Sequence, residues 1–408
     1  MNNTSSKSKL KYPLVDSSYN ITEINKSIEV LKSGQLTMGA MVKKFEYLFT
    51  NYIDIPYSVM VNSGSSANLL AFSAITNPAR KNHLCLGDKV AIPAVCWPTS
   101  LWPIIQTGLV PVLIDVDPNT LNLSLDSLRK AIVKEDIKAL MMVHTLGNST
   151  EIEGLLDIVN NNNIILIEDT CESLGTKYQD DFLGSIGDFG TFSFYFSHHM
   201  TTIEGGMIVC KNLDDYDLLK CLRTHGWSRE QSNKEELERD NSNIDPRWLF
   251  INMGFNLRPM EIQAAFGIEQ IKRLDVMNIH RKENVDRIQQ TFIKNSRWED
   301  QLAFPKPTKD LDPCWFGFPF LIRKKLIMEK LREALLFNGI ENRPIISGNI
   351  AIQPAIKLFN VDLSMGPFVG AQEIHDRGLF VGCHSKLLDD DAIAHLVRII
   401  LDEIQKLS

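Results

Sequence analysis

The sequence predicts an α/β fold followed by a smaller α+β unit. Short apolar, β-branched runs alternate with segments of helical apolar spacing through the first 300 residues. This alternation is typical of a largely parallel sheet that is covered by helices. Three prolines, Pro305, Pro307 and Pro313, then mark a boundary before another set of strands and helices. We therefore expect a large domain over residues 12–300 and a small domain over residues 301–408.

The expected elements are assigned from apolar spacing for helices and from β-branched, apolar runs for strands. In the large domain, helices are expected at 21–33, 42–51, 69–75, 125–133, 152–160, 214–223 and 271–293. Its strands are expected at 57–61, 90–92, 110–114, 139–143, 164–167, 190–195 and 207–210. In the small domain, strands are expected at 316–322, 340–343 and 379–382, and helices at 328–337, 371–377 and 390–407. The highly charged segment 230–245 is expected to be a surface insertion or flexible loop.

The composition argues against several classes of protein. A net charge of −7 without a Lys/Arg-rich block does not suit nucleic-acid binding. No apolar run reaches the ~18 residues that a membrane helix needs. The seven cysteines are scattered and never form C-x-x-C, which favours reduced thiols in a cytoplasmic protein. Residues 1–11 are rich in polar side chains, and we expect them to form a disordered tail.

A turn of small residues follows the strand expected at 57–61 and precedes a helix. It contains Gly64 and Ser65 within the run N-S-G-S-S-A-N. Backbone N–H groups and hydroxyls can converge on a phosphate at such a turn, and the helix dipole favours the negative charge. A simple serine cap would give a similar sequence.

Two further strands are followed by side chains that could bind a ligand or take part in catalysis. Asp169 and Glu172 follow the strand expected at 164–167, and the carboxyl ends of strands are where open α/β sheets bind ligands. Asp169 could equally be a helix cap. Trp97 follows the strand expected at 90–92, where it could serve core packing or face a ligand.

The segment 193–206 reads S-F-Y-F-S-H-H-M-T-T-I-E-G-G and lies between two expected strands. Taken alone, its histidine pair favours a structural turn in which both side chains are hydrogen-bonded and have no catalytic role. The segment resembles one in the DegT/DnrJ/EryC/StrS family of sugar aminotransferases, where a Lys holds pyridoxal phosphate as a Schiff base ahead of T-G-E-G-G. Counting back from Glu204, that Lys position is occupied by His198. The chain is thus similar to a small branch of the family in which His replaces Lys and the enzyme is a sugar 3-dehydratase.

The resemblance implies fold type I of the pyridoxal-phosphate enzymes, with a mostly parallel seven-stranded sheet in the large domain. It also implies a homodimer with shared active sites. The implied cofactor-binding residues are Gly64, Ser65, Trp97, Asp169, Glu172, Ser193 and Asn256, with Asn256 completing the site of the partner subunit. His225 and Arg258 are implied substrate contacts, although Arg258 could equally form a surface ion pair.

The missing Lys sets the expected chemistry. Imidazole cannot form the internal Schiff base, so pyridoxal 5'-phosphate and its working form, pyridoxamine 5'-phosphate, should be held non-covalently. His198 should act as general base while the hydroxyl at carbon 3 of a nucleotide-linked 4-keto-6-deoxy sugar leaves. The expected substrate is a GDP-linked hexose or heptose, and L-glutamate should regenerate the amine form.

A related His-type branch carries an iron–sulfur cluster, whose cysteines follow the H-G-W segment closely. After residues 225–227, this chain has no Cys until Cys314, so we expect no such cluster.

Other functions stay open. An ordinary nucleotide-sugar 4-aminotransferase would need its Lys elsewhere, because none occurs between Lys177 and Lys211. A non-catalytic relative would not need Asp169 as part of an electron sink. A dehydratase that acts on a CDP- or dTDP-linked sugar is also compatible with the sequence.

Overall fold

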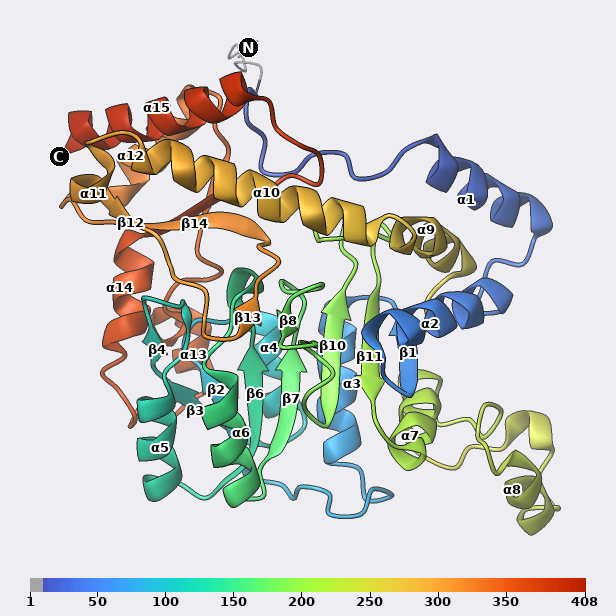
Figure 1. The fold of residues 1–408 in the computed structure, drawn as a ribbon. Helices are drawn as coiled ribbons and strands as arrows, with labels where there is room; N and C mark the ends of the chain where they lie inside the picture. The colour runs from blue at the N-terminus through green and yellow to red at the C-terminus, as the bar shows by residue number, and fades with distance from the viewer. Residues whose placement is uncertain (1–9) are drawn as a thin grey trace, which may run out of the picture.

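The computed structural model describes residues 10–408, so most of the expected disordered tail lies outside the described residues. A seven-stranded sheet forms the centre of the molecule, in the order β1-β11-β10-β7-β6-β2-β3 (Figure 1). Its strands are β1 (Tyr57–Val61), β2 (Lys89–Pro93), β3 (Val110–Ile114), β6 (Ile137–Val143), β7 (Ile165–Asp169), β10 (Phe189–Ser193) and β11 (Gly206–Cys210). Six strands of this sheet run in one direction, and β11 runs in the opposite direction between β1 and β10. The predicted α/β fold with a mostly parallel seven-stranded sheet is confirmed.

Helices cover both faces of this sheet. Val59 and Val61 of β1 share one hydrophobic cluster with α3 (Gly64–Ile75), α4 (Pro98–Gln106) and α7 (Leu213–Arg223). Met60 points to the opposite face, since side chains alternate along a strand. There it packs with α2 (Ala40–Ile53) and α9 (Glu261–Ile271). On this same face, α5 (Leu125–Lys134) and α6 (Ile152–Asn161) pack against β2, β3, β6 and β7.

A second sheet lies beside the first and is fully antiparallel, in the order β12-β14-β16-β15. Its strands are β12 (Leu302–Ala303), β14 (Gly317–Ile322), β15 (Asn342–Pro344) and β16 (Gly378–Gly382). Around it lie α10 (Leu274–Ile293), α11 (Trp298–Gln301), α12 (Met328–Phe337), α14 (Val369–Arg377) and α15 (Asp390–Leu407) (Figure 1).

The remaining elements complete the fold. These are α1 (Ile21–Ser33), α8 (Lys234–Asp240), α13 (Pro354–Leu358), β4 (Val116–Asp117), β5 (Asn122–Leu123), β8 (Lys177–Tyr178), β9 (Asp181–Phe182), β13 (Leu311–Asp312) and three 3-10 turns at Thr145–Gly147, Pro246–Trp248 and Ile350–Ile352. The charged segment 230–245 contains α8, which has no buried residue and projects from the body (Figure 1). Among residues 10–408, every helix is too short or too polar to cross a bilayer.

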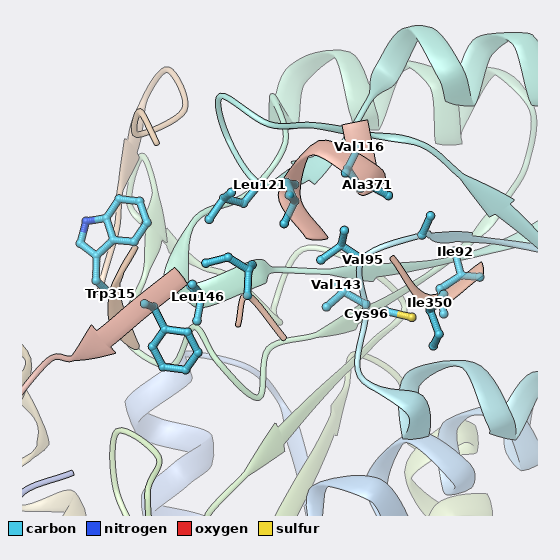
Figure 2. Close-up of a cluster of buried hydrophobic side chains, with 14 of the residues drawn as sticks. Ile92, Val95, Cys96, Val116, Leu121, Val143, Leu146, Trp315, Ile350 and Ala371 are labelled. Carbon is cyan, nitrogen blue, oxygen red and sulfur yellow. The ribbon is translucent and has the colours of Figure 1, made fainter. Parts of the chain in front are cut away.

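The hydrophobic core is continuous between the two sheets. Val143, at the end of β6, and Cys96, which follows β2, belong to the same buried cluster as Trp315, Ile350 and Ala371 from the carboxyl-terminal part of the chain (Figure 2). The amino-terminal segment also joins this part, because the Tyr12 hydroxyl donates to the carbonyl of Gly382 at 2.9 Å. The division of the chain at residue 300 stays a prediction.

Candidate active site

Three predicted site residues meet at the carboxyl edge of the large sheet. Gly64 begins α3 directly after β1, Asp169 ends β7, and Ser193 ends β10. A Cβ atom on Gly64 would lie 2.6 Å from the Ser193 Cβ and 3.0 Å from the Cys171 Sγ. The first turn of α3 can therefore approach these strand ends only because residue 64 lacks a side chain.

The turn before α3 is a capped helix start, and the helix begins five residues earlier than we predicted. The Ser63 hydroxyl accepts from the backbone N–H of Ser66 at 3.1 Å, so the predicted serine cap is present. Ser65 is exposed and shares a 2.8 Å hydrogen bond with the Thr99 hydroxyl at the start of α4. The cap and the predicted anion site are compatible, because Ser63 serves the helix while Ser65 faces outward.

Asp169 is a buried carboxylate that is held by three donors. Its Oδ2 accepts from Asn68 at 2.9 Å and from Ser100 at 2.7 Å, and its Oδ1 accepts from the Cys171 N–H at 3.1 Å. The Thr191 hydroxyl donates to Asn68 at 2.6 Å, which fixes the orientation of that amide. The residues after Asp169 form a turn rather than a helix, so the helix-cap interpretation is wrong.

Sequence reasoning missed Asn68, Ser100 and Thr191. Asn68 did carry a signal, because it is a polar residue in a helix whose other buried positions are apolar or Gly. Buried polar groups are normally hydrogen-bonded, so such a residue points to a partner elsewhere in the chain. Its partner Asp169 is 101 positions away, and no local pattern identifies it.

The imidazole of His198 is held in one tautomer. Its Nδ1 lies 2.6 Å from the carbonyl oxygen of Cys171; since a carbonyl only accepts, Nδ1 carries the proton. Burial lowers the pKa of His198 to about 4, which keeps the ring neutral near pH 7 and leaves Nε2 unprotonated. The ring also packs against Phe316, with centroids 5.0 Å apart. His198 is thus an oriented group that can accept a proton at Nε2.

Glu172 follows Cys171, the partner of His198, in the chain and is half-buried. Its Oε2 accepts from the Leu146 N–H at 3.0 Å. Burial raises the pKa of Glu172 to about 7, and the charge of Asp169 acts in the same direction. Near neutrality the carboxyl group can therefore donate or accept a hydrogen bond.

Trp97 is 56% exposed, so core packing does not explain it. It precedes α4, and the carbonyl of its neighbour Cys96 accepts from the Ser347 hydroxyl at 2.7 Å. The backbone N–H of Ile350 donates to Ala94 at 2.9 Å. A loop from the carboxyl-terminal part of the chain thus fixes the segment that presents this indole.

His225, Asn256 and Arg258 form a second group. They lie on segments 224–227 and 250–258, which two isolated antiparallel bridges join into an irregular ribbon. The N–H of His225 donates to Phe255 at 2.7 Å, and the Arg258 Nε donates to the Asn256 Oδ1 at 2.9 Å. Within residues 10–408, Arg258 has no carboxylate at ion-pair distance, so the alternative of a surface ion pair finds no support there. Asn256 is exposed. The ribbon adjoins the first group through its backbone, where the carbonyl of Leu257 accepts from the N–H of Asn62 at 3.1 Å.

The cysteines are dispersed through the fold. All seven are free, and five of them are buried. Among residues 10–408, no group of three or more His, Cys, Asp or Glu side chains is placed to bind a metal ion.

Residues 18–400 match the family described as the DegT/DnrJ/EryC1/StrS aminotransferase family. The chain belongs to this family. The match covers nearly the whole chain and includes both groups of candidate residues.

Several members of the family are similar to the chain over most of its length. GDP-4-keto-6-deoxy-D-mannose 3-dehydratase of Escherichia coli O55:H7 is 36% identical over 393 residues, which cover 94% of this chain and 97% of that protein. dTDP-4-dehydro-2,6-dideoxy-D-glucose 3-dehydratase of Saccharopolyspora spinosa is 30% identical over 397 residues, which cover 93% of this chain and 84% of that protein. The E. coli GDP-4-keto-6-deoxy-D-mannose-3-dehydratase, solved with bound hydrated PLP, superposes with a TM-score of 0.89 at 35% identity, covering 96% of this chain and all of the other.

Proposed function

We propose that this chain is a nucleotide-sugar 3-dehydratase that depends on pyridoxamine and pyridoxal phosphate. Its substrate is a GDP-linked 4-keto-6-deoxy sugar, a hexose or a heptose, and its product is the 4-keto-3,6-dideoxy sugar for a surface polysaccharide. One observation supports the proposal: His198, which falls at the Lys position of the family when counted back from Glu204, is a neutral imidazole with a free Nε2. Two relatives at 36% and 35% identity are named GDP-4-keto-6-deoxy-D-mannose 3-dehydratase.

The residues at the sheet edge fit pyridoxal phosphate. The start of α3 at Gly64 and Ser65 would receive the phosphate, since N–H groups converge there and a Cβ on Gly64 would close the space toward Ser193. Asp169, fixed by three donors, would hold the proton on the pyridine nitrogen. The exposed indole of Trp97 would cover the ring face, and Glu172 would lie near the ring hydroxyl. When bound, the cofactor supplies the electron sink for loss of the substrate hydroxyl.

His198 would move the proton in this reaction. Its Nε2 is unprotonated near neutrality and can accept a proton from carbon. The burial that makes this imidazole a weak base makes its conjugate acid a strong one. His198 can therefore give the proton to the hydroxyl at carbon 3. That hydroxyl must be protonated by a strong acid in order to leave as water.

We further propose a cytoplasmic homodimer with shared active sites, which uses L-glutamate as the amino donor. Asn256 supports the shared site, because its side chain is exposed and, within residues 10–408, is bonded to Arg258 and not to Gly64, Asp169 or Ser193. The amide would reach the cofactor phosphate of the partner subunit. His225 and Arg258 lie on the same ribbon and would contact the substrate there. The seven free cysteines agree with a reducing compartment.

The test is an assay with a panel of substrates. The full chain is incubated with pyridoxal phosphate, L-glutamate and 4-keto-6-deoxy sugars linked to GDP, CDP or dTDP, and the products are weighed by mass spectrometry. We expect the GDP sugar to lose one oxygen atom while 2-oxoglutarate and ammonia accumulate in equal amounts. A 4-amino sugar as the main product would instead make the protein an aminotransferase, and turnover of only a CDP or dTDP sugar would overturn the GDP assignment.

A further inference from the structure

His199 follows the proposed base directly but faces the opposite way. Its side chain is fully buried, and its Nε2 lies 3.0 Å from the carbonyl oxygen of Cys314. Within the part of the chain that the structure describes, its Nδ1 has no hydrogen-bond partner. Burial, together with the nearby Arg281 cation, lowers the pKa of His199 well below its usual value. A neutral ring that is sealed from the site cannot serve as the catalytic base.

The two adjacent imidazoles carry opposite tautomers. His198 donates from Nδ1 to Cys171, whereas His199 must donate from Nε2 to Cys314, because each carbonyl can only accept. The ring of Phe316 packs against both imidazoles, with centroids 5.0 Å from His198 and 5.9 Å from His199. At the histidine pair, the turn between β10 and β11 is thus bonded in two directions, through His198 to the residue after β7 and through His199 to the segment before β14.

The segment that receives His199 is itself fixed. The N–H of Cys314 donates to the Thr176 hydroxyl at 2.9 Å, and the N–H of Phe316 donates to Leu146 at 3.0 Å. A Cβ atom on Gly147 would lie 2.1 Å from the carbonyl oxygen of Cys314. The backbone at Gly147 therefore packs closely against this carbonyl, which limits the movement of the acceptor of His199.

We propose that His199 is a positioning residue, which holds the turn so that His198 keeps its Nδ1–H bond to Cys171 and presents Nε2 to the substrate. Only the catalytic consequence of this inference rests on the proposed function. Without the bond to Cys314, the turn loses the contact that holds it directly beside His198; the next contact, from the N–H of Thr201 to Gln270 Oε1 at 3.2 Å, lies two residues further along the chain. The imidazole of His198 then exchanges between tautomers, and a fraction of molecules presents a protonated Nε2 that cannot act as base.

Two amide variants separate positioning from packing. In His199→Gln, the side-chain amide nitrogen can stand where Nε2 stood and still donate to Cys314. In His199→Asn, the nitrogen stands nearer to the position of Nδ1, and the carbonyl of Cys314 loses its donor. His384→Asn is the control, because His384 is another buried imidazole that donates from Nε2 to a carbonyl, that of Pro13 at 2.8 Å.

The readout is the tautomer of His198 in the full chain, measured by long-range ¹H–¹⁵N correlation with ¹⁵N-labelled histidine and assigned with His198→Asn. We expect the wild type, His199→Gln and His384→Asn to show one Nδ1–H form, and His199→Asn to show both forms. The kcat should fall up to about 10²-fold in His199→Asn, with KM little changed, and should recover in His199→Gln. A single unchanged tautomer in folded His199→Asn would overturn the inference. A wild type with this pattern but no dehydratase activity would overturn the proposed function alone.

Discussion

The side chain of Asn68 donates a 2.9 Å hydrogen bond to Oδ2 of Asp169 and so ties the first turns of α3 to the end of β7. The same oxygen accepts from Ser100 in α4. Two helices that start at the sheet edge thus hold one carboxylate, and they leave it little freedom to turn.

Asp169→Asn should lower kcat by about 10²-fold or more while the protein still folds. A neutral amide cannot hold the pyridine proton electrostatically, and its NH₂ group would face the donors Asn68 and Ser100. Steady-state kinetics with pyridoxal phosphate in excess measure the effect. Asp188→Asn is the matched control, because Asp188 is exposed and accepts from the N–H of Leu166 at 2.9 Å. Near-normal turnover of Asp169→Asn would leave the carboxylate with a purely structural role.

The pH dependence of turnover should show an unusually acidic base. The pKa of His198 is lowered to about 4 by burial, so the required neutral form persists well below the ~6.5 of an ordinary histidine. On the acidic side of the pH profile, kcat/KM should therefore fall only as pH drops through about 4. Circular dichroism checks that the protein is still folded over this pH range. His198→Asn should lose roughly 10²–10⁴-fold in kcat. A limb near pH 6.5 would contradict the buried environment.

Glu172 should make the protein less stable as pH rises. Its pKa is raised in the folded state to about 7 from 4.5, so the folded protein binds a proton that the unfolded chain releases between these values. Stability is then lost as pH rises through this window, by on the order of 1–2 kcal/mol for a half-buried group. Glu172→Gln should gain in Tm relative to wild type at pH 8 but little at pH 5. Glu153→Gln, at an exposed site in α6, should show no such change, and an equal gain at both pH values would refute the shift.

The cofactor should not be attached covalently. No Lys lies between Lys177 and Lys211, and His198 cannot form the bond that an amine forms. Borohydride reduction of the protein with pyridoxal phosphate, followed by digestion and mass spectrometry, should give no pyridoxyl peptide from the candidate site. A modified Lys there would remove the central premise of the proposed function.

Mixed dimers should regain activity from two inactive chains. Chains with Asn256→Asp lack the group proposed for the partner's phosphate site, and chains with His198→Ala lack the base. If sites are shared, one site of the mixed dimer carries both lesions and the other is intact. Differently tagged chains are purified as mixed dimers and assayed. Activity no higher than that of either parent would show that Asn256 serves its own subunit.

The fold could be predicted well because its signals are local. Apolar spacing placed α12 and α15 at their observed bounds. The antiparallel direction of β11 could not be predicted, since a strand's apolar pattern is the same in either direction. The start of α3 was placed too late because the small polar residues around Gly64 are typical of a loop. In the structure these residues form the first turn of the helix, and Ser63 caps it.

Candidate residues could be named from sequence where one stretch carries the chemistry, as at His198 and Asp169, and their roles stay predictions. Partners that come from distant segments were missed, such as Cys171 for His198 and Cys314 for His199. These two acceptors are backbone carbonyls. Every residue has a backbone carbonyl, so the residue type does not show which one accepts a side-chain hydrogen bond. The identities of Asn68 and Ser100 did carry information, but only the tertiary fold shows what they bind.

The continuous core between the two sheets bears on how the molecule denatures. A buried cluster that contains Cys96 and Val143 as well as Trp315 and Ile350 cannot be separated along the chain without opening apolar surface on both sides. Melting of one part therefore exposes the other, which favours a single cooperative transition over stepwise loss of the carboxyl-terminal part of the chain. A fragment that ends near residue 300 would present the uncovered side of this cluster to water, and such a surface promotes aggregation.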